Sequence, residues 1–237
     1  MNTRYAIVLG AIALAVGAAR AQAPVPAVVA SVAGAEAPSP WDASFAAFAA
    51  EDRAAPPPGG AVLFVGSSSI RMWSGLEGDF GGGKVVLKRG FGGSKLSDCV
   101  KNLQRLVIRY APRTVLVYAG DNDLAGGSTP AQVLERFTAF VGGVRHALPD
   151  TRIDFISIKP SPLRASLIGE IRTTNALIHD YVASQPGLAY IDVYTPMLDA
   201  DGAPRRELFR DDALHLNKAG YALWQSVIAP YVQQAAR

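Results

Sequence analysis

Short apolar runs recur along the chain between residues 61 and 193. Each is rich in Val, Ile, Leu or Phe, and together they cover residues 61–65, 84–87, 114–119, 153–158 and 188–193. Near-continuous apolar runs of this kind are typical of strands that are covered on both faces. They therefore predict a sheet that is buried between layers of helices.

Longer segments with helical periodicity lie between most of these runs, over residues 94–109, 130–147, 164–185 and 217–235. The second of them begins after Ser-Thr at 128–129, a helix start signal, and Pro149 follows its end. A short amphipathic helix is also expected over 41–53. Because strand–helix alternation favours helices on both faces of a sheet, we predict one α/β domain over 41–237, a three-layer α/β/α sandwich with about five parallel strands.

The N-terminal segment differs from the rest of the chain. Arg4 precedes an apolar run over 5–19, and the segment ends on Ala-Gln-Ala at 21–23. This order is typical of a secretory signal peptide, and the apolar run is shorter than the roughly 20 residues that a membrane span needs. We therefore predict a signal peptide over 1–23, a flexible linker over 24–40, and export to the periplasm or the medium without stable membrane insertion. An uncleaved N-terminal anchor is the alternative.

Composition narrows the classes of partner and cofactor. Apolar residues make up 49% and charged residues 18% of the chain, which excludes a wholly disordered protein. The 23 basic and 20 acidic side chains nearly balance, and no basic patch is interleaved with aromatics, so nucleic acid is not an expected partner. Cys99 is the single cysteine and the three histidines lie in different segments, so no internal disulfide, no metal site and no other cofactor is expected. The oligomeric state is not predicted.

Small and polar residues follow three of the predicted strands, in segments 66–69, 90–94 and 120–123. In an open parallel sheet, ligands bind outside the carboxyl ends of the strands. One glycine-rich turn is ordinary in an α/β protein. Three of them at the same edge of a sheet predict a functional site at that edge.

Among the three histidines, His215 has the surroundings of a general base. His146 lies near the end of one predicted helix and His179 in the middle of another, and both positions suit surface residues. His215 lies between the last predicted strand and the last helix, three residues after Asp212. On one turn, this spacing places a carboxylate and an imidazole on the same side.

Nucleophilic catalysis by serine requires the residue types that gather at these positions. A serine hydroxyl is a weak nucleophile, so a neutral imidazole must take its proton, and an aspartate fixes the imidazole tautomer. The oxyanion that forms needs preorganised donors, such as the backbone N–H groups of glycine turns or an asparagine amide. The serines of 67–69, the glycines of 90–93, Asn122, Asp212 and His215 supply all of these groups.

The segment 66–70 reads Gly-Ser-Ser-Ser-Ile and resembles the Gly-Asp-Ser-Leu block of the SGNH hydrolases, a family also known as GDSL-type esterases and lipases. The resemblance extends over residues 61–227 and implies a flavodoxin-like three-layer fold. The spacing from Gly66 places Ser68 at the nucleophile, with Ser69 as the alternative. The backbone N–H of Ser68 is then one of the oxyanion donors that the resemblance implies.

Three further blocks follow in the order of the family. Gly93 matches a glycine whose backbone N–H is an oxyanion donor, and Asn122 matches an asparagine whose side-chain amide is another. Asp212 and His215 match the final Asp-x-x-His block. The resemblance therefore implies a carboxylic ester hydrolase with Ser68, His215 and Asp212 as its catalytic residues.

Two positions depart from the family's pattern. Ser67 stands in place of the Asp before the nucleophile, and we expect it to tune the turn without abolishing activity. Asp121 stands where the third block more often has Thr, and it is expected to add a carboxylate near the cleft unless it points away. Lys159 and Arg164 follow the fourth predicted strand, where they either belong to a structural loop or meet an anionic group.

The sequence favours an exported esterase that cleaves short acyl or acetyl esters, for example acetyl groups on a carbohydrate. Lysophospholipids and thioesters are alternative substrates within the resemblance. A non-catalytic carbohydrate- or lipid-binding domain is the alternative from another class, because a fold does not by itself establish activity. Trp73 lies on the helix expected after Ser68, either in the core or in the wall of an acyl or sugar pocket.

Overall fold

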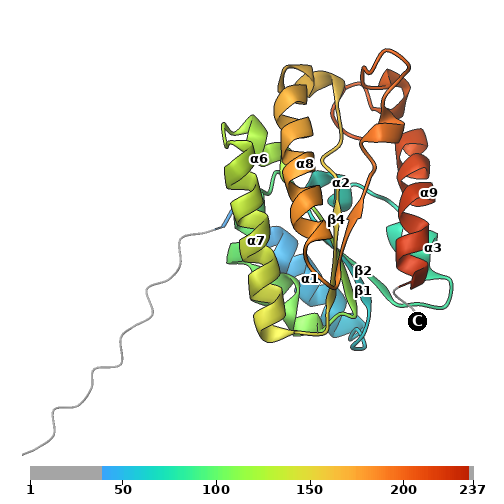
Figure 1. Ribbon diagram of the computed structural model, residues 1–237. Coiled ribbons are helices and arrows are strands. Elements are labelled where there is room, and N and C mark those ends of the chain that lie inside the picture. Colours follow the sequence, from blue (N-terminus) through green and yellow to red (C-terminus); the bar gives the residue numbers. More distant parts are fainter. Residues whose placement is uncertain (1–38, 235–237) are drawn as a thin grey trace, which may run out of the picture. The chain divides into compact units, whose positions relative to one another are not determined.

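A five-stranded parallel sheet forms the centre of the computed structural model, which describes residues 39–234 (Figure 1). The strands are β1 (Val62–Gly66), β2 (Val86–Gly90), β3 (Thr114–Tyr118), β4 (Arg152–Ile156) and β5 (Leu188–Ile191). Their order is β2-β1-β3-β4-β5, and every neighbouring pair is parallel. The predicted parallel sheet of about five strands is therefore confirmed.

Helices cover both faces of this sheet (Figure 1). One face carries α1 (Asp42–Ala54), α4 (Leu96–Lys101), α5 (Leu103–Leu106), α7 (Pro130–Ala147) and α8 (Ile168–Ala183). The other face carries α2 (Ser68–Arg71), α3 (Leu76–Gly81) and α9 (Lys218–Gln234). The loops contain α6 (Asp121–Ala125) and the 3-10 helices η1 (Ile108–Tyr110), η2 (Pro162–Leu167), η3 (Thr195–Met197) and η4 (Arg206–Leu208).

The side chains of β1 alternate between two hydrophobic clusters, one under each helix layer. Leu63 and Val65 pack in the cluster that α7 and α8 cover, whereas Val62 and Phe64 pack in the cluster that α9 covers. Successive residues of a strand point to opposite faces, so a strand that is covered on both sides has no polar face. This is the physical origin of the continuous apolar run at 61–65.

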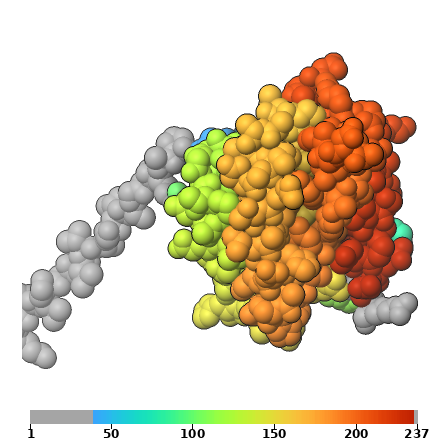
Figure 2. All heavy atoms as spheres, turned by 45° about the horizontal axis from the view of Figure 1, so that its top comes forward, coloured from blue at the N-terminus to red at the C-terminus, as the bar shows by residue number. Residues whose placement is uncertain are grey.

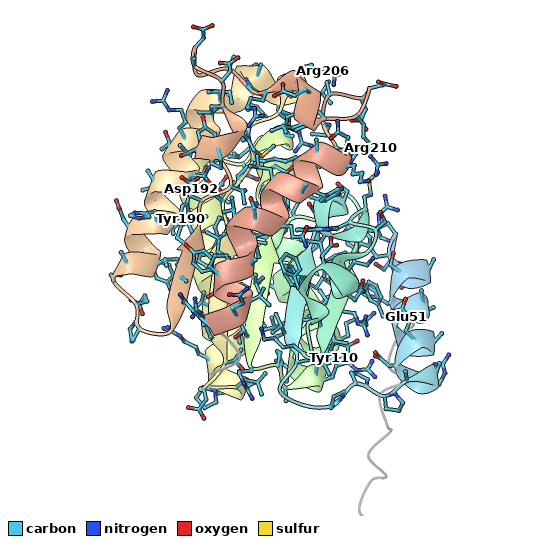
Figure 3. The ribbon with its side chains drawn as sticks, turned by 90° about the vertical axis from the view of Figure 1, so that its right-hand side faces the viewer. Glu51, Tyr110, Tyr190, Asp192, Arg206 and Arg210 are labelled. Atoms are coloured by element: carbon cyan, nitrogen blue, oxygen red, sulfur yellow. The ribbon has the colours of Figure 1, made fainter. Side chains whose placement is uncertain are left out.

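β2 is the strand whose predicted bounds, 84–87, differ most from the structure. Charged residues end the apolar run, yet Arg89 continues the strand and is only 4% exposed. Its guanidinium forms an ion pair with Asp52 of α1, and its Nε donates to the hydroxyl of Tyr110 at 2.8 Å. A buried charge is tolerated when it is paired in this way. Figure 3 labels Glu51 and Tyr110 on the side of the molecule where this cluster fastens α1 to the sheet.

Two predicted helices are interrupted in the structure. The segment 94–109 forms α4, α5 and η1, and the first break falls at Asn102, whose backbone N–H and side-chain amide both donate to the carbonyl of Asp98, at 3.1 and 2.9 Å. The segment 164–185 begins with η2 before α8 starts. By contrast, α7 has the predicted bounds, and Thr129 caps it by accepting the N–H of Gln132 at 3.3 Å.

The predicted signal peptide, 1–23, and residues 24–38 of the predicted linker lie outside the described residues. Within 39–234, no helix is both long enough and apolar enough to cross a membrane.

Candidate active site

β1 ends in a turn that brings Ser68 to the surface of a pocket. Gly66 has a φ of +140°, and a Cβ there would lie 1.8 Å from the carbonyl oxygen of Tyr118 on β3, so only glycine fits. The Ser67 N–H donates to the same oxygen at 3.0 Å, and the chain then enters α2 at Ser68. Ser67 and Ser69 are buried, whereas Ser68 lines the pocket. The geometry thus favours Ser68 over Ser69 as the reactive serine.

His215 reaches Ser68 from the opposite end of the chain. The distance from Ser68 Oγ to His215 Nε2 is 3.0 Å. The Arg210 N–H donates to the carbonyl of His215 at 2.8 Å, and Arg210 Nε donates to that of Leu216 at 3.0 Å, so Arg210 holds the loop on both sides of the imidazole. Figure 3 shows Arg206 and Arg210 at the end of the molecule where α9 begins.

Asp212 contacts the other side of the same imidazole. Its Oδ2 lies 2.7 Å from His215 Nδ1, while its Oδ1 accepts the backbone N–H groups of Leu214 and His215 at 3.0 and 2.9 Å. The expected proximity is present, but it arises in a loop with Ala213 at a φ of +55° and not on a helical turn.

Hydrogen bonds from the side chain and backbone of His215 hold the pKa of Asp212 well below its usual value. An ionised carboxylate only accepts hydrogen bonds, so the proton of the neutral imidazole lies on Nδ1. His215 Nε2 is then left to accept the hydroxyl proton of Ser68. The arrangement can therefore deprotonate a serine hydroxyl.

Gly93 and Asn122 lie on the same pocket as Ser68. Gly93 follows β2 with a φ of +75°, and a Cβ added there would have no atom within 4 Å. Asn122 is the second residue of α6, and its Nδ2 donates to the carbonyl of Ser94 at 3.1 Å. Its Oδ1 accepts a hydrogen bond from Arg164 Nη2 at 2.7 Å. Both predicted oxyanion donors therefore lie on the pocket that Ser68 lines.

The pocket has a volume of about 480 Å³ and includes residues that the sequence did not single out, namely Pro40, Trp41, Ser44 and Leu214. Trp41 Nε1 donates to the carbonyl of Gly92 at 2.9 Å, and its ring meets that of Phe91 edge-on at 5.3 Å between centroids. Nothing in the local sequence indicates that Trp41 belongs to a site, because the pattern there predicts only the start of an amphipathic helix. Only the packing of α1 beside β2 brings it to the pocket.

Asp121 points away from the pocket into a buried cluster. Its Oδ2 lies 3.0 Å from Lys159 Nζ, 3.0 Å from Arg164 Nη1 and 3.1 Å from the hydroxyl of Tyr118. Burial by itself would raise the pKa of Asp121, but the charges of Lys159 and Arg164 outweigh it and lower that pKa. The anionic group that Lys159 and Arg164 meet is therefore Asp121.

The loops that carry these groups adjoin one another at the carboxyl edge of the sheet. The N–H of Leu163 in η2 donates to the carbonyl of Ala213 at 3.0 Å, which joins the loop after β4 to the His215 loop. Figure 2 turns this end of the molecule forward and shows the gold surface after β4 against the orange-red surface before α9.

Trp73 belongs to the core and does not line the pocket. α2 ends at Arg71, so Trp73 lies beyond the helix on which it was expected. It is 1% exposed, and its Nε1 donates to a carboxylate oxygen of Asp79 at 2.8 Å. Its ring packs against that of Trp224 from α9, at 6.0 Å between centroids.

The remaining candidates for chemistry lie apart from this pocket. Cys99 is buried and unpaired, and burial raises the pKa of its thiol. His146 and His179 are exposed. Over the part of the chain that the structure describes, no group of three or more His, Cys, Asp or Glu side chains is placed to hold a metal ion.

Solved structures with the same fold include several hydrolases. A GDSL-like lipase from Bacteroides thetaiotaomicron has a TM-score of 0.70 and 20% identity, covering 81% of this chain and 98% of that one. A lipase/acylhydrolase from Enterococcus faecalis has a TM-score of 0.62 and 19% identity, covering 73% and 96%. A family 3 carbohydrate esterase from Talaromyces cellulolyticus has a TM-score of 0.58 and 19% identity, covering 74% and 97%.

Sequence comparison gives a more specific result than the fold. No curated protein matches the chain significantly. The family model of the GDSL-like lipases and acylhydrolases matches residues 65–223, which is well over half of the sequence and extends from the end of β1 into α9. That segment contains Ser68 and the loop that carries His215, and this chain therefore belongs to the GDSL-like lipase/acylhydrolase family of hydrolases.

Proposed function

We propose that this chain is a serine esterase in which Ser68 is the nucleophile, His215 the general base and Asp212 the residue that orients the base. One observation carries the proposal. Ser68 Oγ lies 3.0 Å from His215 Nε2, and His215 Nδ1 lies 2.7 Å from Asp212 Oδ2, so hydroxyl, imidazole and carboxylate form one continuous chain of contacts.

In this mechanism, His215 Nε2 takes the hydroxyl proton while Ser68 Oγ bonds to the carbonyl carbon of the ester. The tetrahedral intermediate then collapses, the imidazolium gives its proton to the departing alkoxide, and an acyl-serine remains. Water then attacks the carbonyl carbon of this acyl group while His215 takes a proton from the water. The acid leaves, and the proton returns to the Ser68 oxygen, which restores the hydroxyl.

Three donors are proposed to stabilise the oxyanion: the backbone N–H of Ser68, the backbone N–H of Gly93 and Nδ2 of Asn122. Support comes from the pocket that Ser68, Gly93 and Asn122 line together. Preorganised donors of this kind act where charge develops in the transition state, and the loss of one costs about 10²–10³-fold in kcat.

A short acyl group on a polar alcohol, such as acetyl on a carbohydrate, is the proposed substrate. The pocket lining combines the polar groups of Ser44, Arg71 and Asn122 with the apolar surfaces of Trp41 and Leu214. A long acyl chain needs a continuous apolar wall, whereas a sugar ring uses both apolar contact and hydrogen bonds. The fold shared with a carbohydrate esterase of family 3 supports the same substrate class.

Export is proposed on the order of charge, apolar run and Ala-Gln-Ala in residues 1–23. N-terminal sequencing of the protein recovered from the periplasm or the medium tests it. A chain that begins after Ala23 supports the proposal, and an intact Met1 in that fraction contradicts it.

Labelling with a fluorophosphonate probe tests the catalytic proposal directly, because the probe bonds covalently to an activated serine. We expect the wild-type protein and Ser69→Ala to be labelled and Ser68→Ala to remain unlabelled. Esters of increasing acyl length then measure the substrate preference, with kcat/KM expected to fall beyond short acyl groups. A folded wild-type protein that neither reacts with the probe nor hydrolyses any ester would instead be a non-catalytic binding domain.

A further inference from the structure

The buried cluster behind the pocket suggests a function beyond stability. We propose that Arg164 is a positioning residue that fixes the amide of Asn122 as an oxyanion donor, and that Asp121 and Lys159 hold Arg164 in place. The inference rests on the proposed esterase function. Its central observation is the hydrogen bond from Arg164 Nη2 to Asn122 Oδ1 at 2.7 Å.

The chemistry of the two side chains determines which way the amide of Asn122 faces. A primary amide has an oxygen that only accepts and a nitrogen that only donates, and the two ends have nearly the same shape. A guanidinium has donors and no acceptor. Arg164 therefore admits the oxygen of Asn122 and rejects its NH₂ group, so a half-turn of the amide would place two sets of N–H groups against each other.

The two N–H groups of Asn122 then have distinct partners. Nδ2 donates one of them to the carbonyl of Ser94 at 3.1 Å. The second is available to the pocket, which Asn122 lines beside Ser68. With Oδ1 held by Arg164, the amide is fixed at both ends before substrate arrives. Preorganisation of this kind is what makes an oxyanion donor effective.

Arg164 is itself held by an ion pair inside the protein. Its Nη1 lies 3.0 Å from Asp121 Oδ2, and the same oxygen is 3.0 Å from Lys159 Nζ. Lys159 is 2% exposed and also donates to the hydroxyl of Tyr118 at 3.0 Å. A lysine is almost never buried to this extent without such partners. Asp121 therefore links two cations that come from the loop after β4.

The charges of the cluster do not cancel. Lys159 and Arg164 carry two positive charges against the single negative charge of Asp121. The neighbouring carboxylate, Asp123, has its own partner in Arg136 at 2.7 Å. A net positive charge thus lies behind the amide of Asn122, and it polarises that amide in the direction that strengthens its N–H donors.

Arg136 also provides a matched control. Arg164 and Arg136 both pair with an aspartate of α6 and both are partly buried, with exposed side-chain fractions of 14% and 29%. Arg164 contacts Asn122, whereas Arg136 contacts Asp123 and the hydroxyl of Ser128. If these arginines serve only to hold α6 in place, the two substitutions should have similar effects on catalysis.

The test measures kcat and KM for a short-chain aryl ester, with each rate normalised to the sites that a fluorophosphonate titrates to completion. We expect Arg164→Met to lower kcat by about 10–100-fold with KM nearly unchanged, somewhat less than the loss of Asn122 itself. Arg164→Lys keeps a donor-only cation and should recover part of that loss. Arg136→Met should stay within about threefold of wild type.

A double-mutant cycle then separates positioning from stability. If Arg164 acts through the amide, Arg164→Met should have almost no further effect in an Asn122→Ala background. Equal losses of kcat from Arg164→Met in both backgrounds, or equal losses from Arg164→Met and Arg136→Met, would overturn the positioning role while leaving the esterase intact. A wild-type protein without hydrolysis or labelling would overturn the proposed function and the inference together.

Discussion

The carboxylate of Asp212 holds His215 at two points. Oδ2 meets Nδ1 of the imidazole at 2.7 Å, and Oδ1 accepts the backbone N–H of the same residue at 2.9 Å. One side chain thus sets both the tautomer of the base and the course of the loop that carries it. The two contacts use different oxygens, so substitutions can separate them.

Asp212→Asn and Asp212→Ala should differ for this reason. Asparagine keeps an acceptor for the backbone N–H but no longer enforces a proton on Nδ1, so kcat should fall by up to about 10⁴-fold with little change in thermal stability. Alanine loses both contacts, and we expect a lower Tm in addition. Steady-state kinetics with thermal melts checks this. Equal melting temperatures for the two variants would show that the backbone contact does not stabilise the loop.

Ser68→Ala and His215→Ala should each lower kcat by roughly 10⁶-fold, and the double variant should be little worse than either. The reason is that a nucleophile without its base, or a base without its nucleophile, retains almost none of the function of the pair. Measurement of kcat on one activated ester for the three variants decides this. Losses that multiply in the double variant would argue against a shared role for the 3.0 Å contact.

Gly66→Ala should lower the stability of the folded protein, whatever its effect on catalysis. The new Cβ would lie 1.8 Å from a backbone oxygen on β3, at a φ of +140°, so we expect a loss of roughly 2–4 kcal/mol or failure to fold. Gly202→Ala is the control, because its φ is +77° but no atom lies within 4 Å of the added Cβ, and its cost should be about 1–2 kcal/mol. Urea unfolding compares the two, and similar costs would contradict the steric argument.

The raised pKa of Asp154 leads us to expect that the stability of the protein depends on pH. Burial raises the pKa of this carboxyl to about 6, although the contact with Arg152 lowers it. Because the folded-state value lies above the ordinary value of 3.8, folding favours the protonated form. The associated stability is present below the ordinary pKa and is lost as pH rises through about 6.

Wild-type protein should therefore lose stability relative to Asp154→Asn between pH 4 and pH 8, by on the order of 3 kcal/mol. Urea unfolding of both proteins across this range measures the difference. Asp201→Asn, at an exposed position, provides the control and should show no such trend. A difference between wild type and Asp154→Asn that stays constant with pH would exclude a raised pKa at Asp154.

Trp41 should affect recognition of the alcohol more than chemistry. Trp41→Ala removes a wall of the pocket, and we expect kcat/KM to fall roughly tenfold for esters with bulky alcohols and to change little for methyl esters. Phe48→Ala is the control from α1, the helix that begins directly after Trp41, because Phe48 packs against the core and does not line the pocket. Equal losses for both variants on both kinds of ester would indicate a general effect of α1.

From the sequence alone we could predict the sheet, most of its helices and the positions where small polar residues follow the strands. The continuous apolar run at 61–65 predicts a strand buried on both faces, because it has no polar side chain that could face the solvent. The bounds of β2 are harder to predict, since Lys88 and Arg89 interrupt the apolar pattern. Only the tertiary contact with Asp52 makes it possible to bury the charge of Arg89.

Some residues of the candidate site could likewise be predicted from the sequence, and others could not. Ser68, Gly93, Asn122, Asp212 and His215 could be named from the sequence, because each lies at a strand end or in a loop and matches a block of the family that the chain resembles. Trp41 and the partnership of Asp121, Lys159 and Arg164 could not. These residues come together across long separations in the chain, and local spacing carries no information about which buried charges meet. Which charges meet depends on how the loops after β3 and β4 pack against each other, and this packing is established only in the folded chain.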